Sequence, residues 1–188
     1  MTKPTTLILL CEDDTTSMML RAYLKRHGIS HGIRMNVTQS GSGFDWVLRH
    51  YEMEIDAYRV SKAKVVTWLI VAIDADQGSV PGRINQLDAR LKQSEVQRVR
   101  EMRVEDERIA RLVPRRNVET WLLALTGTAV TEEVDYKNTK DKEDWLDLAE
   151  PAGLELFNRT RTNADIPAHF VPSLQHAVHE LRRLENAE

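Results

Sequence analysis

The sequence predicts an α/β protein of three layers, in which a mostly parallel sheet of four strands lies between helices and a helical tail follows. Short apolar runs alternate four times with longer segments whose apolar residues recur at helical spacing. Parallel strands need crossover helices, so this alternation favours a parallel sheet over an antiparallel one. With 188 residues, of which 41% are apolar and 29% charged, the chain can bury one sizeable core.

The first strand and helix are predicted near the N-terminus. Residues 5–11 form a continuous apolar run, which is typical of a strand covered on both faces. A helix follows, for which Thr15 or Thr16 is the expected N-cap and Gly28 the expected end. Its apolar face is formed by residues at helical spacing: Leu20, Tyr23, Leu24 and His27.

The second and third units repeat this order. Residues 33–38 predict a short strand, and the turn at 40–43, Ser-Gly-Ser-Gly, opens the next helix. The run 65–73 is the strongest strand signal in the chain, and Gly78 and Pro81 separate it from a third helix. The two helices have apolar faces formed by Phe44, Val47, Leu48, Tyr51 and Ile55, and by Ile84, Leu87 and Leu91.

The fourth unit and the tail follow a less regular segment. We expect a strand over 108–113 and a helix that begins after Asn117 and ends near Gly127. A polar connection then leads to a short helical piece at 144–149 and a final amphipathic helix at 172–184. The four units together predict a Rossmann-like, three-layer sheet with a helical tail.

We divide the chain into an α/β domain over residues 1–127 and a helical C-terminal extension over 128–188 that packs on it. The formal net charge of −3 gives no global positive field that would indicate a nucleic-acid binder. The apolar run near the N-terminus is too short for a signal peptide or a membrane span. We therefore expect a cytoplasmic protein that does not interact with membranes.

Acidic residues follow two of the predicted strands. Glu12-Asp13-Asp14 comes directly after the run 5–11, and Asp74-Ala75-Asp76 comes after the run 65–73. The carboxyl ends of parallel strands are where open α/β sheets build their binding sites. For Asp13 and Asp14 we favour a structural role as solvated or helix N-terminal anions, which the helix dipole stabilises.

The carboxylates of Glu12, Asp74 and Asp76 are the candidates for a metal site. Side chains two residues apart on an extended strand point to the same side, so Asp74 and Asp76 could both face a neighbouring strand. If the first and third strands are neighbours, Glu12 joins them in one crevice. Hard divalent cations prefer convergent carboxylate oxygens, and we expect one or two Mg²⁺ ions, or Mn²⁺, in this crevice.

These residues resemble a known family. A glutamate after the first strand, glycines after the second and Asp-x-Asp after the third resemble the Toprim fold of topoisomerases, primases and OLD-type nucleases. The segment 114–124 contains Glu119-Thr120-Trp121-Leu122-Leu123 and resembles the Glu-x-Trp-Leu-Leu helix of small Toprim-like proteins in bacterial phage-defence loci. The sequence departs from the Toprim pattern at Asp13, where a glycine usually follows the first glutamate.

The resemblance implies a Mg²⁺- or Mn²⁺-dependent nuclease that hydrolyses phosphodiester bonds of DNA or RNA. It also implies an effector role in anti-phage defence, with an ABC-type ATPase as partner. Carried over residue by residue, the catalytic and metal-binding positions are Glu12, Asp74, Asp76 and Glu119. Phosphate binding needs cations in addition to the metal, and the nearest candidates are Arg115, Arg116, Lys137 and Lys140.

Two alternatives remain open. Residues 7–14 and the helix that ends at Arg26-His27-Gly28 also resemble a response-regulator receiver, in which Asp74 would be the phosphate acceptor. The receiver is the weaker match, because no strand ending in Ser or Thr is followed by a Lys-Pro turn at the appropriate place. The third hypothesis is a non-catalytic Toprim-like subunit that serves only assembly.

Overall fold

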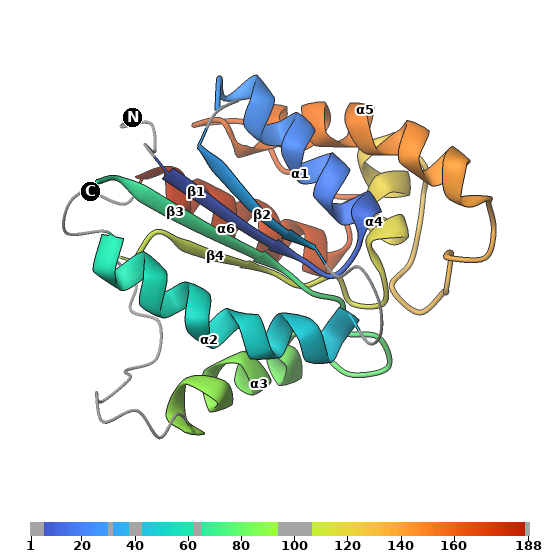
Figure 1. Ribbon diagram of the computed structural model, residues 1–188. Coiled ribbons are helices and arrows are strands. Elements are labelled where there is room, and N and C mark those ends of the chain that lie inside the picture. Colours follow the sequence, from blue (N-terminus) through green and yellow to red (C-terminus); the bar gives the residue numbers. More distant parts are fainter. Residues whose placement is uncertain (1–5, 30–31, 38–42, 62–64, 94–106, 187–188) are drawn as a thin grey trace.

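A computed structural model describes residues 6–29, 32–37, 43–61, 65–93 and 107–186. Within these ranges the chain forms a four-stranded sheet between two layers of helices (Figure 1). All strand pairs are parallel, and the order across the sheet is β2-β1-β3-β4. The predicted fold class is therefore confirmed, with strands β1 (Thr6–Cys11), β2 (Ile33–Val37), β3 (Thr67–Ala72) and β4 (Ile109–Leu112).

The helices divide between the two faces of the sheet. One face is covered by α2 (Gly43–Ser61) and α3 (Val80–Gln93), which lie on the lower side of the sheet in Figure 1. The opposite face packs against the other four helices of the described chain. These are α1 (Asp14–Arg26), α4 (Val118–Leu125), α5 (Lys142–Thr160) and α6 (Pro172–Asn186).

The alternation of side chains along β1 explains why this strand is apolar on both faces. In β1, Leu7 and Leu9 belong to the hydrophobic cluster on the α1 side, whereas Ile8 and Leu10 belong to the cluster on the α2 side. Successive side chains of a strand point to opposite faces, and here both faces are covered by helices. The central strands of such a sheet therefore need apolar residues on both faces, as the continuous runs in β1 and β3 predicted.

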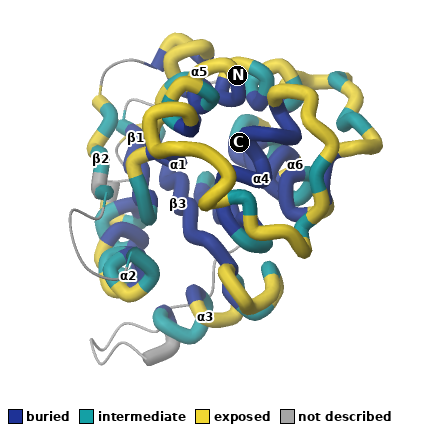
Figure 2. The backbone as a smooth tube through the Cα atoms, turned by 90° about the vertical axis from the view of Figure 1, so that its right-hand side faces the viewer, coloured by how far each residue is buried: buried dark blue, intermediate teal, exposed yellow. Residues whose placement is uncertain are grey.

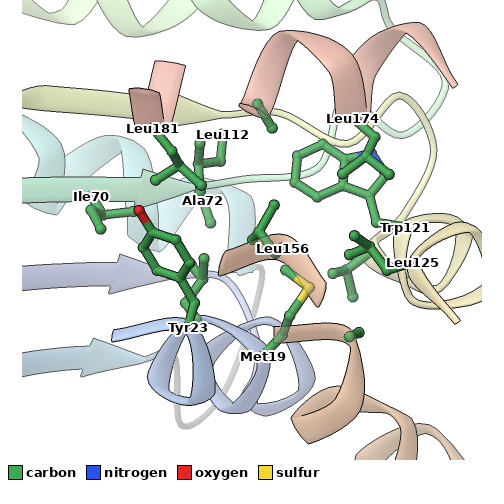
Figure 3. Packing of buried hydrophobic residues seen from close by; sticks show 14 of the residues in the cluster. Met19, Tyr23, Ile70, Ala72, Leu112, Trp121, Leu125, Leu156, Leu174 and Leu181 are labelled. Atoms are coloured by element: carbon green, nitrogen blue, oxygen red, sulfur yellow. The ribbon is translucent and has the colours of Figure 1, made fainter. Parts of the chain in front are cut away.

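The larger cluster joins the N-terminal strands to the C-terminal helices. All eight residues of α4 are buried, and Figure 2 shows that α4 and β3 run through the interior of the molecule. The indole of Trp121 donates a hydrogen bond of 2.8 Å to Ser173 Oγ at the start of α6. Figure 3 shows Trp121 of α4, Leu156 of α5 and Leu174 of α6 in the same cluster as Met19 of α1. Residues from both sides of position 128 thus form one continuous core.

Two expectations about helix ends were wrong. The N-cap of α1 is Asp13, whose Oδ1 accepts a hydrogen bond of 2.7 Å from the backbone N–H of Thr16. An aspartate one residue before the helix caps it as well as a threonine does, which places Thr15 and Thr16 in the first turn. The short helix expected at 144–149 is instead the 19-residue helix α5, which continues through Pro151. Pro151 leaves the carbonyl group of Asp147 without a donor, and Asp147 is exposed, so water can reach that group.

The outer edge of β4 is covered by side chains of α6. Glu180 accepts a hydrogen bond of 3.1 Å from the backbone N–H of Arg111. Arg183 donates to the carbonyl oxygen of Ile109, and at 2.7 Å to that of Glu107. An uncovered edge strand presents unpaired backbone groups to which another chain can pair. Helix α6 occupies this edge, so the sheet ends at β4.

Replacement of Glu180 tests this edge contact. The Glu180→Ala variant leaves the buried N–H of Arg111 without its acceptor, so we expect a loss of about 1–3 kcal/mol in the free energy of unfolding. Glu180→Gln retains an acceptor oxygen and should lose less than half as much. Urea unfolding followed by circular dichroism measures both variants, and equal losses would show that the hydrogen bond to Arg111 contributes little.

Candidate functional site at the carboxyl ends of β1 and β3

The two acidic segments meet because β1 and β3 are neighbours. Cys11 pairs with Ala72 in the register of the two strands, so each chain leaves the sheet at the same level. Directly beyond, Glu12 Oε2 accepts a hydrogen bond of 3.1 Å from the backbone N–H of Asp74. The adjacency on which the sequence hypothesis depended is therefore confirmed.

Gly43 gives the Glu12 side chain the space that it occupies. Gly43 is the first residue of α2, and a Cβ placed there would lie 2.3 Å from Glu12 Cγ and 3.0 Å from Glu12 Oε1. A contact of 2.3 Å between carbon atoms is not tolerated, so a side chain at this position would displace Glu12. This explains one glycine of the predicted turn. The other, Gly41, lies outside the described residues.

Asp74 carries the most buried carboxylate of the two strand ends. Only 7% of the residue is exposed, and no donor in the described part of the chain makes a hydrogen bond to its carboxylate. Burial raises the pKa of Asp74 well above its ordinary value, and the charges of Asp13, Glu12, Glu119 and Asp76 raise it further. Asp74 is thus a buried, unpartnered carboxylate among like charges.

Glu12 and Glu119 share this environment. Burial is the main cause that raises the pKa of each, and Asp13 raises both further. Glu119 lies in the first turn of α4 and is 7% exposed, and Lys137 acts in the opposite direction by lowering its pKa. The glutamate that sequence resemblance singled out is therefore part of the same electrostatic cluster as the residues at the strand ends.

Asp76 does not continue an extended strand after Asp74, contrary to the expectation, although both residues line one cavity. Strand β3 ends at Ala72, and Asp76 has a left-handed backbone with φ 53°. Its side chain is 58% exposed and forms an ion pair of 3.2 Å with Arg83. Asp76 therefore contributes charge to the cluster, but its carboxylate is held at the edge by an arginine.

Arg83 is a residue of the site that the sequence did not reveal. It lies on α3, is 8% exposed, and places its guanidinium carbon 3.8 Å from the centre of the Phe44 ring. Burial lowers the pKa of Arg83, while Asp76, Glu12 and Asp74 oppose this effect. In the sequence Arg83 is one of several polar positions on an amphipathic helix, so no local signal distinguishes it.

Two cavities open onto the acidic cluster, and Asp74 and Lys137 line both. The larger cavity has a volume of 660 Å³ and lies between the N-terminal ends of α1, α2, α4 and α5. Its lining consists of Glu12, Asp13, Asp14, Thr15, Gly43, Asp74, Glu119, Lys137, Asn138, Lys140, Asp141, Lys142 and Trp145. The smaller cavity, of 170 Å³, is lined by Asp74, Asp76, Gln77, Arg116, Asn117, Asp135 and Lys137.

Three of the four predicted cations line these cavities. Lys137 borders both, Lys140 lines the larger one and Arg116 the smaller one. The ammonium of Lys140 lies 6.0 Å from the centre of the Trp145 ring. Arg115 donates a hydrogen bond of 3.3 Å to the backbone oxygen of Asp76. Lys137 is thus the one of the four predicted cations that lines both cavities.

The segment 128–141, here called the strap, is fixed by side-chain hydrogen bonds. The indole of Trp145 donates a bond of 3.1 Å to the backbone oxygen of Lys137. The carboxylate of Asp135 accepts a bond of 2.7 Å from the Asn117 amide and one of 3.0 Å from the N–H of Lys137. These hydrogen bonds therefore hold Lys137 close to the start of α4.

The arrangement offers oxygen ligands but no complete metal cage. Among the described residues, no three Asp, Glu, His or Cys side chains are arranged so that they could hold a metal ion together.

In the same part of the chain, no helix is long and apolar enough to cross a membrane.

Comparison with models of protein families, with curated proteins and with solved structures finds no match.

A double-mutant cycle tests the contact between Gly43 and Glu12. Gly43→Ala should lower the free energy of unfolding by about 1–3 kcal/mol, because the new Cβ overlaps Glu12 Cγ. In a Glu12→Ala background the same replacement should cost little, since the overlapping atoms are absent. Urea unfolding of the four proteins measures the coupling. Equal costs in both backgrounds would contradict the contact.

The raised pKa of Asp74 predicts a pH-dependent gain in stability when its charge is removed. Protonated Asp74 contributes stability that is fully present below the unfolded-state pKa and is lost as the pH rises through the higher folded-state pKa. In EDTA, Asp74→Asn should therefore stabilise the protein more at pH 8 than at pH 4. Urea unfolding at both pH values tests this, with the exposed Asp147→Asn as control. A variant less stable than wild type at pH 8 would contradict the cause given for the pKa.

Proposed function

We propose that the protein is a Mg²⁺- or Mn²⁺-dependent nuclease that hydrolyses phosphodiester bonds of nucleic acid at the cavity floor. The carboxylate of Asp74 carries this proposal. It is buried, borders both cavities, and has neighbouring acids but no hydrogen-bond donor within the described residues. An ionised group in such surroundings is unfavourable unless a positive charge compensates it, and a bound cation provides that charge.

The donor groups suit Mg²⁺ in particular. Mg²⁺ takes oxygen ligands, retains several waters and is usually held by one or two carboxylates together with substrate phosphate, so it does not need a cage of three side chains. Asp74 and Glu12, which a hydrogen bond links through the Asp74 backbone, are the first candidates, and Glu119 is the third. Asp76 would have to exchange its ion pair with Arg83 to join them. A bound ion would neutralise charge on the phosphate and polarise it.

The protein's own groups account for the remaining requirements of hydrolysis. A carboxylate of the cluster that does not bind the ion can accept a proton from the attacking water, and Glu119, whose pKa burial raises, lines the same cavity. The water oxygen forms a bond to phosphorus, and the bond between phosphorus and one sugar oxygen breaks. That sugar oxygen leaves with its part of the strand. Lys137 borders both cavities, and its ammonium can bind a phosphate oxygen of a strand at their junction.

The cellular role follows from resemblance alone. The pattern of small Toprim-like proteins in phage-defence loci supports a role as nuclease effector beside an ABC-type ATPase. The alternative of a non-catalytic subunit predicts full biological activity when Glu12 and Asp74 are neutralised.

The architecture favours the nuclease over the receiver. A doubly wound receiver has a fifth strand next to the fourth, in the order 2-1-3-4-5. Here the outer hydrogen-bonding groups of β4 at Arg111 and Ile109 are taken by Glu180 and Arg183 of α6. A fifth strand would have to displace this helix.

Neutral variants of the two central carboxylates test the nuclease. Asp74→Asn and Glu12→Gln should each reduce Mn²⁺-dependent cleavage of labelled DNA and RNA by about 100-fold or more, because each removes charge that would bind the ion. Asp147→Asn, which changes an exposed acid of α5, should cleave at the wild-type rate. Cleavage that is equal in all four proteins and insensitive to EDTA would rule out this site.

A further inference from the structure

The carboxylates of the acidic cluster are buried at the bottom of a cavity, and this burial limits which form of nucleic acid can reach them. Asp74 and Glu119 are each 7% exposed, and they are reached through a cavity of 660 Å³. That volume is within the range of about 300–1,000 Å³ found for sites that enclose small ligands. The cavity therefore matches a short piece of one strand.

A B-form duplex is too wide to enter a cavity of 660 Å³. The major groove of B-form DNA alone is about 12 Å wide, so the whole duplex is wider still. Its phosphates lie on the outside of a stiff cylinder and reach only groups at the protein surface. Carboxylates that are nine-tenths buried on a cavity floor require a thinner and more flexible chain.

The walls of the cavity are held in place. The strap is fixed to α5 through Trp145 and Lys137, and to the start of α4 through Asp135 and Asn117. Its earlier part is fixed to α6, because Glu132 accepts a hydrogen bond of 2.7 Å from the N–H of Ser173. Opening the site to a duplex would break these contacts.

From the burial, the cavity size and the fixed strap we infer that the substrate is single-stranded DNA or RNA, or a frayed strand end, and not an intact duplex. The inference rests on the proposed nuclease function. Lys137 lines both cavities, so the strand would extend along them with a phosphate beside the Lys137 ammonium. DNA and RNA carry the same phosphates, so contacts with the phosphate backbone do not distinguish DNA from RNA.

The test compares a labelled oligonucleotide, as DNA and as RNA, alone and annealed to its complement with blunt ends, in Mn²⁺. We expect the single strands to be cleaved at least about 10-fold faster, because a duplex must first unpair. Equal or faster cleavage of the blunt duplex would overturn the inference and leave the nuclease proposal intact. Cleavage of none of the four substrates would overturn the nuclease proposal and the inference with it.

Variants that release the strap give an independent measure. Asp135→Ala removes the acceptor for Asn117 and Lys137, and Trp145→Phe keeps an aromatic ring but removes the bond to the Lys137 backbone. Either should narrow the ratio of single-strand to duplex cleavage, whereas Asp147→Asn should leave it at the wild-type value. Unchanged ratios in folded strap variants, as judged by circular dichroism, would show that the strap does not exclude the duplex and would overturn the inference.

Discussion

The pairing of β1 with β3 is the constraint on which the rest of the site depends. Because Cys11 and Ala72 are in register, the chains leave the sheet together and the Glu12 carboxylate accepts the Asp74 backbone N–H. Neither acidic segment would be close to the other in a sheet where β2 or β4 separated the two strands. The crossover helices then set the surroundings, since α2 begins with Gly43 against the Glu12 side chain.

The concentration of buried negative charge at the ends of β1 and β3 explains most of the other features of the site. Glu12, Asp74 and Glu119 all have raised pKa values, with burial as the first cause. Two cations lie close to this charge, Arg83 on one side and Lys137 on the other, and the first is already paired with Asp76. The same burial that makes ionised carboxylates unfavourable gives a bound cation, and a phosphate beside it, a strong electrostatic environment.

Sequence patterns predicted the fold well because both faces of the sheet are covered, so that the central strands β1 and β3 are apolar almost throughout. They also predicted Glu12 and Asp74 as neighbours, although only under an assumed strand order. The sequence patterns failed where the local backbone conformation or tertiary contacts determine the position of a residue. Asp76 has a left-handed backbone in place of an extended one, and the helix α5 continues past Pro151. Arg83 acquires its place in the site through its contacts with Phe44 and Asp76. None of these has a signal in the neighbouring residues.

The central claim is that Glu12 and Asp74 together hold a divalent cation. The most direct measurement is anomalous X-ray diffraction from crystals grown with Mn²⁺, because it locates the ion without reference to activity. We predict an anomalous peak within ligand distance of carboxylate oxygens of both Glu12 and Asp74, and its absence in crystals of Asp74→Asn. Crystals of the wild-type protein with no peak at this position, or with a peak that persists unchanged in the variant, would contradict the account.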